Sequence, residues 1–182
     1  KVGVLGCGLM GSGIAQVAAA AGYTTVVRDV SDAVMAKGKA GIAKSLDKFV
    51  EKGKLAAADR DATLARLSYV TDVAALKDCD IVIEAVTEDL ELKNDLWKQL
   101  DALCPAHTIF ASNTSSLTIA AMASATARAD RFVGLHFFNP VPLMQLVEVV
   151  RTVTTSTATF DRALAFGKSL GKEAVAAKDN SG

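Results

Sequence analysis

The segment Gly6-Cys7-Gly8-Leu9-Met10-Gly11 decides the fold of this chain. It fits the pattern G-x-G-x-x-G, which is weak evidence alone, because glycine is common and the pattern is short. Here the context adds weight. The run Lys1–Leu5 before it is predicted to be a short buried strand, and the apolar run Met10–Ala21 after it is predicted to be a helix that ends at Gly22. A strand, a glycine turn and a helix in this order predict a site where the main chain approaches phosphate groups.

Each glycine of this segment has a different expected role. Gly6 permits the tight turn, Gly8 lets the main chain approach a pyrophosphate, and Gly11 lets the helix pack closely on the sheet. The N-terminus of the helix attracts the phosphates through its partial positive charge. We therefore expect the whole segment, Leu9 and Met10 included, to bind the pyrophosphate of a dinucleotide.

Asp29 strengthens the interpretation of the glycine segment. It ends the next predicted strand, 24–29, and follows Gly11 by eighteen residues, close to the roughly 20 expected for a dinucleotide site. A carboxylate there accepts hydrogen bonds from the adenosine ribose and repels a 2′-phosphate, so it favours NAD over NADP. The neighbouring Arg28 weakens that preference. Two alternatives stay open at this point: a glycine turn that binds nothing, and a methyltransferase, which also has an acid after its second strand.

The rest of the chain continues to alternate strands with helices. Ser31 is predicted to cap a long helix that reaches Lys52 before Gly53. Further strands are predicted at 69–71, 81–86, 109–112, 132–135, 146–150 and 173–177, and further helices at 58–67, 118–122 and 159–170. Continuous Val and Ile runs are typical of strands buried on both faces. We therefore predict one α/β domain over residues 1–182: a Rossmann-type, doubly wound and mostly parallel sheet with helices on both faces.

The composition excludes several kinds of partner. Twenty Lys and Arg balance twenty Asp and Glu in the 182 residues, so no excess charge is present to hold a nucleic acid or an anionic membrane surface. No apolar run approaches the roughly 20 residues that span a bilayer. The three cysteines, Cys7, Cys79 and Cys104, are widely spaced. They fit reduced thiols in the cytoplasm better than disulfides or a metal site, and we expect no metal.

A histidine and a glutamate form the candidate catalytic pair. His136 follows an apolar run and lies at the carboxyl end of a predicted strand, where open α/β sheets bind their ligands. Position alone favours a core histidine without a chemical role. Glu148, however, interrupts the apolar run 146–150, and a buried carboxylate is costly unless something pairs with it. We expect the two side chains on adjacent strands, as a buried general base held by a carboxylate. His107, the other histidine, is predicted to lie at the surface.

A hydroxyl-rich turn, Ser112–Ser116, follows the predicted strand at 109–112. The simpler interpretation is an N-cap for the helix near Thr118–Met122. The turn nonetheless follows a central parallel strand. Its hydroxyls are therefore expected on the same edge of the sheet as the glycine segment.

Four segments resemble the 3-hydroxyacyl-CoA dehydrogenases, and they are distributed over nearly the whole chain. They are GCGLMGSGIAQVAAAAG (6–22), IVIEAVTEDLELK (81–93), IFASNTSSLTI (109–119) and DRFVGLHFFNPVPLMQLVEVV (130–150). The resemblance implies that His136 is the catalytic base and Glu148 its orienting partner. It also implies that Ser115 donates a hydrogen bond at the substrate oxygen and nicotinamide. The methyltransferase alternative is thereby set aside.

The resemblance also implies binding residues. Contacts with NAD beyond the glycine segment are expected from Asp29, Ala85, Glu88, Lys93, Ser115 and Asn139. The alternative for Glu88 and Lys93 is an exposed start of a helix. Ser45 and Lys52, on the long helix after Asp29, match more loosely the positions that contact coenzyme A in the family. Lys52 would otherwise be an ordinary surface lysine.

The implied reaction is oxidation of an (S)-3-hydroxyacyl-CoA to a 3-ketoacyl-CoA in fatty-acid metabolism, with hydride transfer to NAD. A fourth active-site residue of the family is an asparagine that follows an Asp-x-x-Gly-Phe stretch, and this sequence runs to Gly182. We expect that asparagine, and the family's helical domain with most of the homodimer interface, outside these residues. Two alternatives remain: an NAD-binding module without turnover, which needs neither His136 nor Glu148, and a β-hydroxyacid dehydrogenase that acts on free acids.

Overall fold

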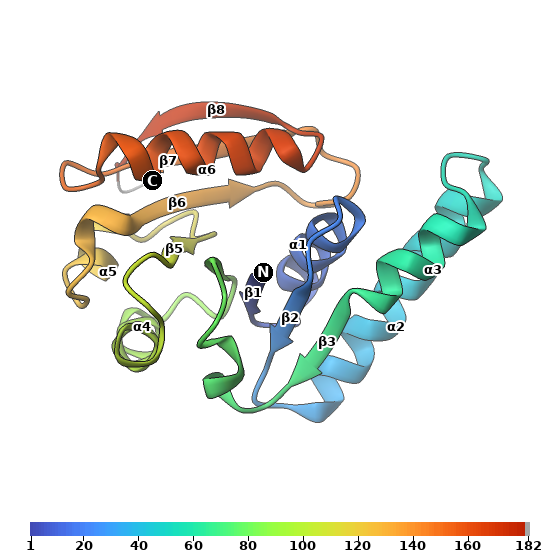
Figure 1. Ribbon diagram of the computed structural model, residues 1–182, viewed down its shortest axis with the longest axis horizontal. Helices are drawn as coiled ribbons and strands as arrows, with labels where there is room; N and C mark the ends of the chain where they lie inside the picture. Colours follow the sequence, from blue (N-terminus) through green and yellow to red (C-terminus); the bar gives the residue numbers. More distant parts are fainter. Residues whose placement is uncertain (181–182) are drawn as a thin grey trace.

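One sheet organises the chain, with the strand order β3-β2-β1-β4-β5-β6-β7-β8 in the computed structural model, which describes residues 1–180 (Figure 1). The strands are Val2–Leu5 (β1), Thr25–Arg28 (β2), Leu67–Val70 (β3), Ile81–Glu84 (β4), Ile109–Ser112 (β5), Phe132–Phe137 (β6), Leu146–Arg151 (β7) and Glu173–Lys178 (β8). Neighbours pair in parallel, except that β6 and β7 are antiparallel. Every predicted strand is present, and the mostly parallel sheet is confirmed.

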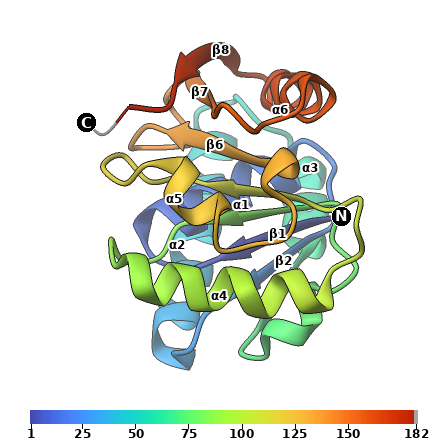
Figure 2. The same ribbon diagram turned by 90° about the vertical axis from the view of Figure 1, so that its left-hand side faces the viewer.

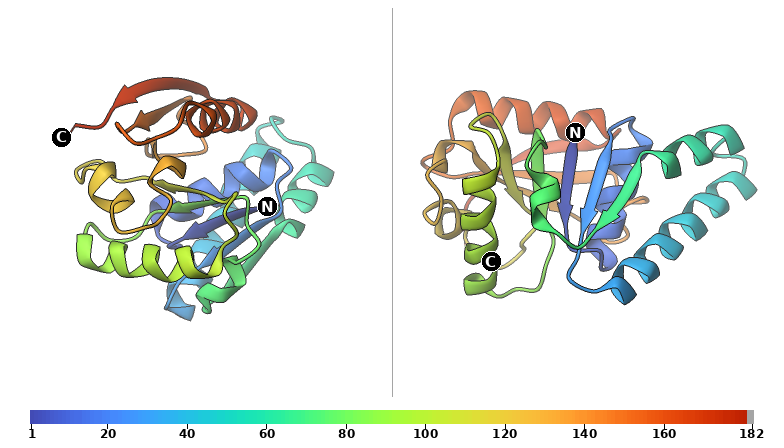
Figure 3. Two further views of the ribbon diagram at one scale, coloured as in Figure 1. Left: turned by 60° about the vertical axis from the view of Figure 1, so that its left-hand side comes forward. Right: turned by 60° about the horizontal axis from the view of Figure 1, so that its bottom comes forward.

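Helices cover both faces of the sheet, as the sequence predicted. One face packs against α1 (Leu9–Ala20), α2 (Asp32–Glu51) and α6 (Thr157–Ser169). The other packs against the 3-10 helix η1 (Val73–Leu76), α4 (Leu90–Leu103) and α5 (Ile119–Ala123). Figures 1 and 2 accordingly show α4 and α6 on opposite sides of the molecule. Helix α3 (Ala57–Ala65) pairs with α2, and the two project away from the strands (Figure 3, right). A second 3-10 helix, η2 (Ala129–Arg131), precedes β6.

Alternate residues of the central strands belong to two separate cores. In β4, Ile81 and Ile83 join the core beneath α1, and Val82 joins the core beneath α4. The second core is built around Trp97, whose ring stacks on Phe110 with 4.9 Å between the ring centroids. Because both faces are buried, the strands are continuous apolar runs instead of alternating ones.

The ends of the long helices follow the predicted signals. The Ser31 side chain accepts a hydrogen bond from Val34 N and so caps α2. Gly22 and Gly53, which follow α1 and α2, have φ angles of +104° and +69°, in the left-handed region that glycine adopts without strain. These local features therefore set where the two helices begin and end.

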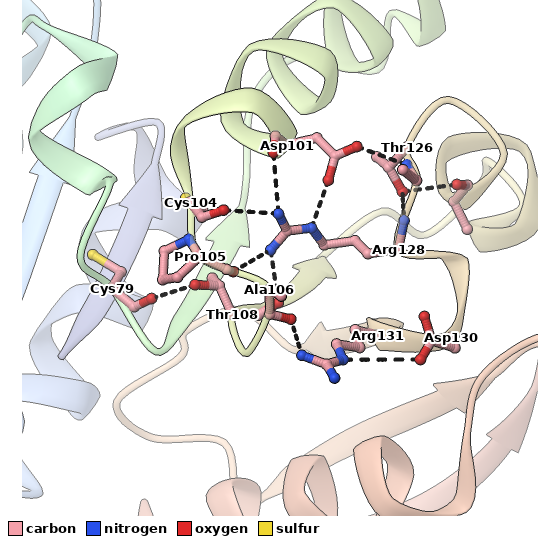
Figure 4. Close-up of polar contacts among 12 residues, drawn as sticks. Cys79, Asp101, Cys104, Pro105, Ala106, Thr108, Thr126, Arg128, Asp130 and Arg131 are labelled. Atoms are coloured by element: carbon pink, nitrogen blue, oxygen red, sulfur yellow. Dashed lines mark hydrogen bonds and ion pairs between the residues drawn. The ribbon is translucent and has the colours of Figure 1, made fainter.

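Arg128 binds the carbonyl groups at the end of α4 (Figure 4). Its guanidinium donates to the main-chain oxygens of Asp101, Cys104, Pro105 and Thr108, and Nε donates to Asp101 Oδ1 at 2.6 Å. The guanidinium carbon also lies 4.4 Å from the centroid of the Phe110 ring. The last carbonyls of a helix have no partner within the helix, so this buried cation satisfies them and opposes the helix dipole.

We predict that Arg128→Met lowers the free energy of unfolding by about 3–5 kcal/mol, because Asp101 and several carbonyls lose a buried charged partner. Urea unfolding measures the change. Arg131→Met is the matched control, because Arg131 is more exposed and donates to one carbonyl, that of Ala106. The control should change stability by no more than about 0.5 kcal/mol. Equal stability of the two variants would contradict the assigned role of Arg128.

Candidate active site

The carboxyl ends of the central strands meet at one edge of the sheet, where a cleft of about 310 Å³ opens. Its lining residues are Met10, Ala85, Val86, Glu88, Lys93, Asn113, Thr114, Ser115, His136, Phe137, Phe138 and Asn139. We call it the strand-end cleft. Seven of the predicted site residues are therefore brought together from four separate parts of the chain. Ligands of open α/β sheets bind at this kind of position, next to the strand at which the order of connection reverses.

Two glycines of the first loop are required by close approach of the main chain. A Cβ atom on Gly6 would lie 2.5 Å from the oxygen of Ala85, and one on Gly11 would lie 2.0 Å from the oxygen of Gly6. Gly6 also has a φ of +95°. By contrast, apart from its chain neighbours, nothing in residues 1–180 lies within 4 Å of a Cβ placed on Gly8. The predicted tight turn and close packing are confirmed, and the space beside Gly8 is free for a ligand.

The side chain of Asp29 is tied to the glycine loop. Its carboxylate accepts from Cys7 N at 2.8 Å and from Ser31 N at 3.2 Å, which holds it at the end of β2. Each carboxylate oxygen can accept a further hydrogen bond. The side chain of Arg28 donates instead to Thr71 O, so it is engaged away from Asp29. Leu9, in the same loop, is 72% exposed and does not line the cleft.

His136 and Glu148 are direct partners across the antiparallel pair β6 and β7. His136 Nδ1 lies 3.7 Å from Glu148 Oε2, a separation longer than a hydrogen bond. The side chains are 24% and 34% exposed. The expected placement on adjacent strands is therefore confirmed, but the expected burial is wrong. His136 lines the strand-end cleft, and both side chains lie outside the two hydrophobic cores, where water reaches them.

Glu84 is a functional candidate that the sequence analysis missed. It ends β4 with no exposed surface, and Oε1 accepts from Lys93 Nζ at 2.7 Å and from Val86 N at 2.8 Å. Oε2 accepts from Ser112 Oγ at 2.6 Å. Lys93 is equally buried, so the alternative of an exposed helix start is wrong for this residue. A charged residue at the end of the apolar run Ile81–Glu84 was the available signal, of the same kind that identified Glu148.

Glu88 holds the turn that carries Ser115. One of its oxygens contacts Lys93 Nζ at 3.4 Å, and the other accepts from Thr114 Oγ1 and Ser116 Oγ at 2.5 and 2.9 Å. Burial raises the pKa of Glu88, but these hydroxyls and the ammonium together hold it below its usual value. Ser115 lies exposed between the two bound residues, and its hydroxyl has no hydrogen-bond partner within residues 1–180. It is therefore free to bind a ligand.

The interpretation of the hydroxyl-rich turn as a cap for α5 is wrong. The N-cap residue of α5 is Thr118, and its side chain makes no capping bond. The first free N–H groups of the helix, those of Ile119 and Ala120, instead donate to the carboxylate of Asp179 at 2.8 and 2.9 Å. A carboxylate supplied after β8 replaces the local cap, which leaves the hydroxyls of Thr114 and Ser116 available to Glu88.

A second cavity, of about 400 Å³, lies between α2 and the turn that joins β6 to β7. Its lining residues are Gly41, Lys44, Ser45, Lys48, Phe49, Lys52, Lys54, Pro140, Pro142 and Leu143. We call it the lysine pocket. Both predicted coenzyme A residues, Ser45 and Lys52, line it. Lys44 and Lys48 were missed, although a spacing of four residues places them and Lys52 on one face of α2.

The three cysteines are buried free thiols. Burial raises the pKa of Cys7 to about 11 and that of Cys79 to about 12, so neither is a nucleophile near neutral pH. Across residues 1–180 no cluster of three or more His, Cys, Asp or Glu side chains is placed to hold a metal ion. In the same range, no helix has the length and apolar character needed to cross a membrane.

Comparison with known proteins identifies a consistent set of relatives. The family model described as "3-hydroxyacyl-CoA dehydrogenase, NAD binding domain" matches residues 1–180. The mitochondrial hydroxyacyl-coenzyme A dehydrogenase of Rattus norvegicus is 52% identical over 187 residues, which cover 100% of this chain and 60% of the rat protein. The 3-hydroxybutyryl-CoA dehydrogenase of Clostridioides difficile is 43% identical over 182 residues, which cover 100% of this chain and 65% of that protein.

Solved structures agree with these matches. The crystal structure of (S)-3-hydroxybutyryl-CoA dehydrogenase PaaH1 from Ralstonia eutropha superposes with a TM-score of 0.95 at 47% identity, over 98% of this chain and 63% of that one. The chain thus spans less than two thirds of the length of the rat, Clostridioides and Ralstonia proteins. The fold of this chain is therefore that of the Ralstonia enzyme over nearly its whole length.

We predict that Glu84→Gln lowers the free energy of unfolding by about 3 kcal/mol, because the buried Lys93 then keeps only the longer, 3.4 Å contact with Glu88 as its ionic partner. The double variant Glu84→Gln with Lys93→Met removes the poorly compensated buried charge and should recover much of the loss. Urea unfolding of the two variants tests this. Glu91→Gln, at an exposed position of α4, is the control and should be neutral. A stable Glu84→Gln variant would mean that the pair is not essential to the fold.

Proposed function

The chain belongs to the 3-hydroxyacyl-CoA dehydrogenase family as its NAD-binding domain, and on this premise we propose that it carries out NAD-dependent oxidation of an (S)-3-hydroxyacyl-CoA to the 3-ketoacyl-CoA. The observation that supports the proposal best is the pairing of His136 with Glu148 at a cleft that also contains Ser115. A module that only binds NAD has no need of this pair. Because the chain spans about three fifths of its rat relative, the activity of the whole enzyme is part of the proposal.

The glycine loop fits a dinucleotide. The N-cap of α1 is Gly8, which has no capping side chain, and the first turn of the helix contains no acidic residue. The N–H groups at this helix end therefore remain available to a pyrophosphate, next to the open space beside Gly8. Asp29 would accept hydrogen bonds from the adenosine ribose. Glu88, Lys93 and Asn139 line the strand-end cleft together with Ala85 and Met10, and the nicotinamide would lie there.

His136 would remove the proton from the 3-hydroxyl of the substrate. NAD, when bound, supplies the acceptor for the hydride that leaves C3. Catalytic hydrogen bonds are often long without ligands and shorten in the substrate complex. If the 3.7 Å separation from Glu148 shortens, Nδ1 donates to the carboxylate and Nε2 becomes the base. The carboxylate then also stabilises the imidazolium that forms.

Ser115 would donate its one hydroxyl proton to the oxygen at C3, and its oxygen could accept from the amide N–H of the nicotinamide. Its hydroxyl is free, whereas those of Thr114 and Ser116 are held by Glu88. The turn is therefore fixed by its neighbours and not by Ser115 itself. Preorganised donors of this kind need no rearrangement when charge develops on the substrate oxygen.

The lysine pocket would bind the phosphates of coenzyme A. Four lysines line it without an acidic residue, and Ser45 is held at its wall by a hydrogen bond from Gln16. Such a pocket favours a coenzyme A thioester over the free acid that a β-hydroxyacid dehydrogenase takes. The three buried free thiols support a reducing compartment. We propose the cytoplasm; the rat relative is named as mitochondrial. That the whole enzyme is a homodimer remains a prediction.

In the enzyme, we predict that His136→Ala lowers turnover of 3-hydroxybutyryl-CoA by roughly 10² or more, the scale for loss of a general base. NADH affinity should stay nearly unchanged. Glu148→Gln should lower turnover to a similar extent, because it keeps the size of the side chain and removes its charge. His107→Ala, at the exposed second histidine, serves as the control for turnover. Wild-type turnover of the His136 variant would contradict the assignment of the base.

For the cofactor, we expect NADH to bind at least tenfold more tightly than NADPH, about 1.4 kcal/mol. Asp29→Asn should narrow this preference, because it removes the charge that repels a 2′-phosphate. The amide oxygen of the variant can still accept from Cys7 N, so the glycine loop should keep its shape. Fluorescence titration with both cofactors measures the ratio. An unchanged ratio in the variant would remove Asp29 from this role.

A further inference from the structure

Lys172, which immediately precedes β8, has a buried ammonium whose hydrogen bonds within the described part of the chain all go to main-chain carbonyl groups. The residue is 9% exposed, and Nζ donates to Val141 O at 2.7 Å and to Met144 O at 2.6 Å. Burial lowers its pKa. Within residues 1–180 no carboxylate lies at ion-pair distance from it. The cost of burying this charge is therefore offset by two carbonyls of a single turn.

That turn, Asn139–Met144, joins β6 to β7 and is shared by both cavities. Asn139 lines the strand-end cleft, and Pro140, Pro142 and Leu143 line the lysine pocket. We call it the proline turn. All other residues of the lysine pocket belong to α2 or to the segment just after it. The pocket therefore exists only while the proline turn lies against α2.

The proline turn is also held from the side of α1. Val141 is 2% exposed, and a Cβ atom on Gly13 would lie 2.8 Å from Val141 Cβ. Leu143, by contrast, is 60% exposed, so the outer side of the turn faces solvent. If Lys172 lost its donors, the two carbonyls could reach water by an outward movement of the turn. The two hydrogen bonds from Lys172 oppose that movement.

We propose that Lys172 is a positioning residue for the lysine pocket. By holding the carbonyls of Val141 and Met144, it sets the separation between the proline turn and the lysines of α2. That separation determines how tightly the pocket binds the phosphates of coenzyme A. The inference rests on the proposed function, because it takes coenzyme A as the ligand of this pocket.

The test compares two ligands on the same sample. Lys172→Met keeps the length of the side chain and removes its donors. We expect coenzyme A to bind at least about tenfold more weakly to this variant, and NADH to change by less than about threefold. Isothermal titration calorimetry of the 182-residue chain measures both affinities. Lys168→Met, at an exposed position of α6, is the matched control and should bind both ligands as the wild type does.

A second variant displaces the proline turn from the opposite side. Gly13→Ala forces Val141 away from α1, and we expect the same selective loss of coenzyme A binding. If Lys172→Met does not fold, this variant still tests whether the position of the proline turn, which Lys172 holds, sets the affinity for coenzyme A. Wild-type affinity for coenzyme A in both variants would overturn the inference. A parallel loss of both ligands would overturn it too, since Lys172 would then support the fold in general. A wild-type chain that does not bind coenzyme A would instead overturn the proposed function.

Discussion

The buried ion pair between Glu84 and Lys93 is the constraint on which the candidate site depends. It joins the end of β4 to α4, and through Ser112 it also joins the end of β5. Two charges without contact with water are tolerated because both oxygens of Glu84 are hydrogen-bonded. Lys93 in turn contacts Glu88, which holds the turn around Ser115. The position of the exposed Ser115 hydroxyl is thus set by a network of charges that begins at the buried Glu84.

The single antiparallel pairing of the sheet has a chemical consequence. Parallel strands need a crossover of a dozen or more residues, whereas antiparallel strands can be joined by a short connection. Here a short connection brings His136 opposite Glu148. The same connection contains the proline turn, which forms a wall of each cavity. One reversal of chain direction therefore sets the positions of His136 and Glu148, and it also separates the two cavities.

Sequence-based interpretation failed where a residue's environment comes from elsewhere in the chain. Lys93 lies in a segment rich in acids and looks like a surface lysine, yet Glu84 and the core around α4 bury it. The turn around Ser115 looks like a helix cap, yet Asp179 caps that helix from sixty residues away. The face of α2 that carries Lys44, Lys48 and Lys52 becomes a pocket only when the proline turn lies opposite.

The amino-acid sequence alone determined the order of the strands and helices, the glycine loop with Asp29, and the two residues of the candidate catalytic pair. These features depend on hydrophobic runs, on helix ends and on glycines that must adopt particular backbone angles, all of which lie within a few consecutive residues. Only the tertiary structure decided which polar groups meet: Glu84 with Lys93, Asp179 with α5, and Lys172 with the proline turn. The last two contacts join residues sixty and thirty-one positions apart. All three depend on how the elements pack, because an unpaired polar group takes whichever partner the packing brings to it.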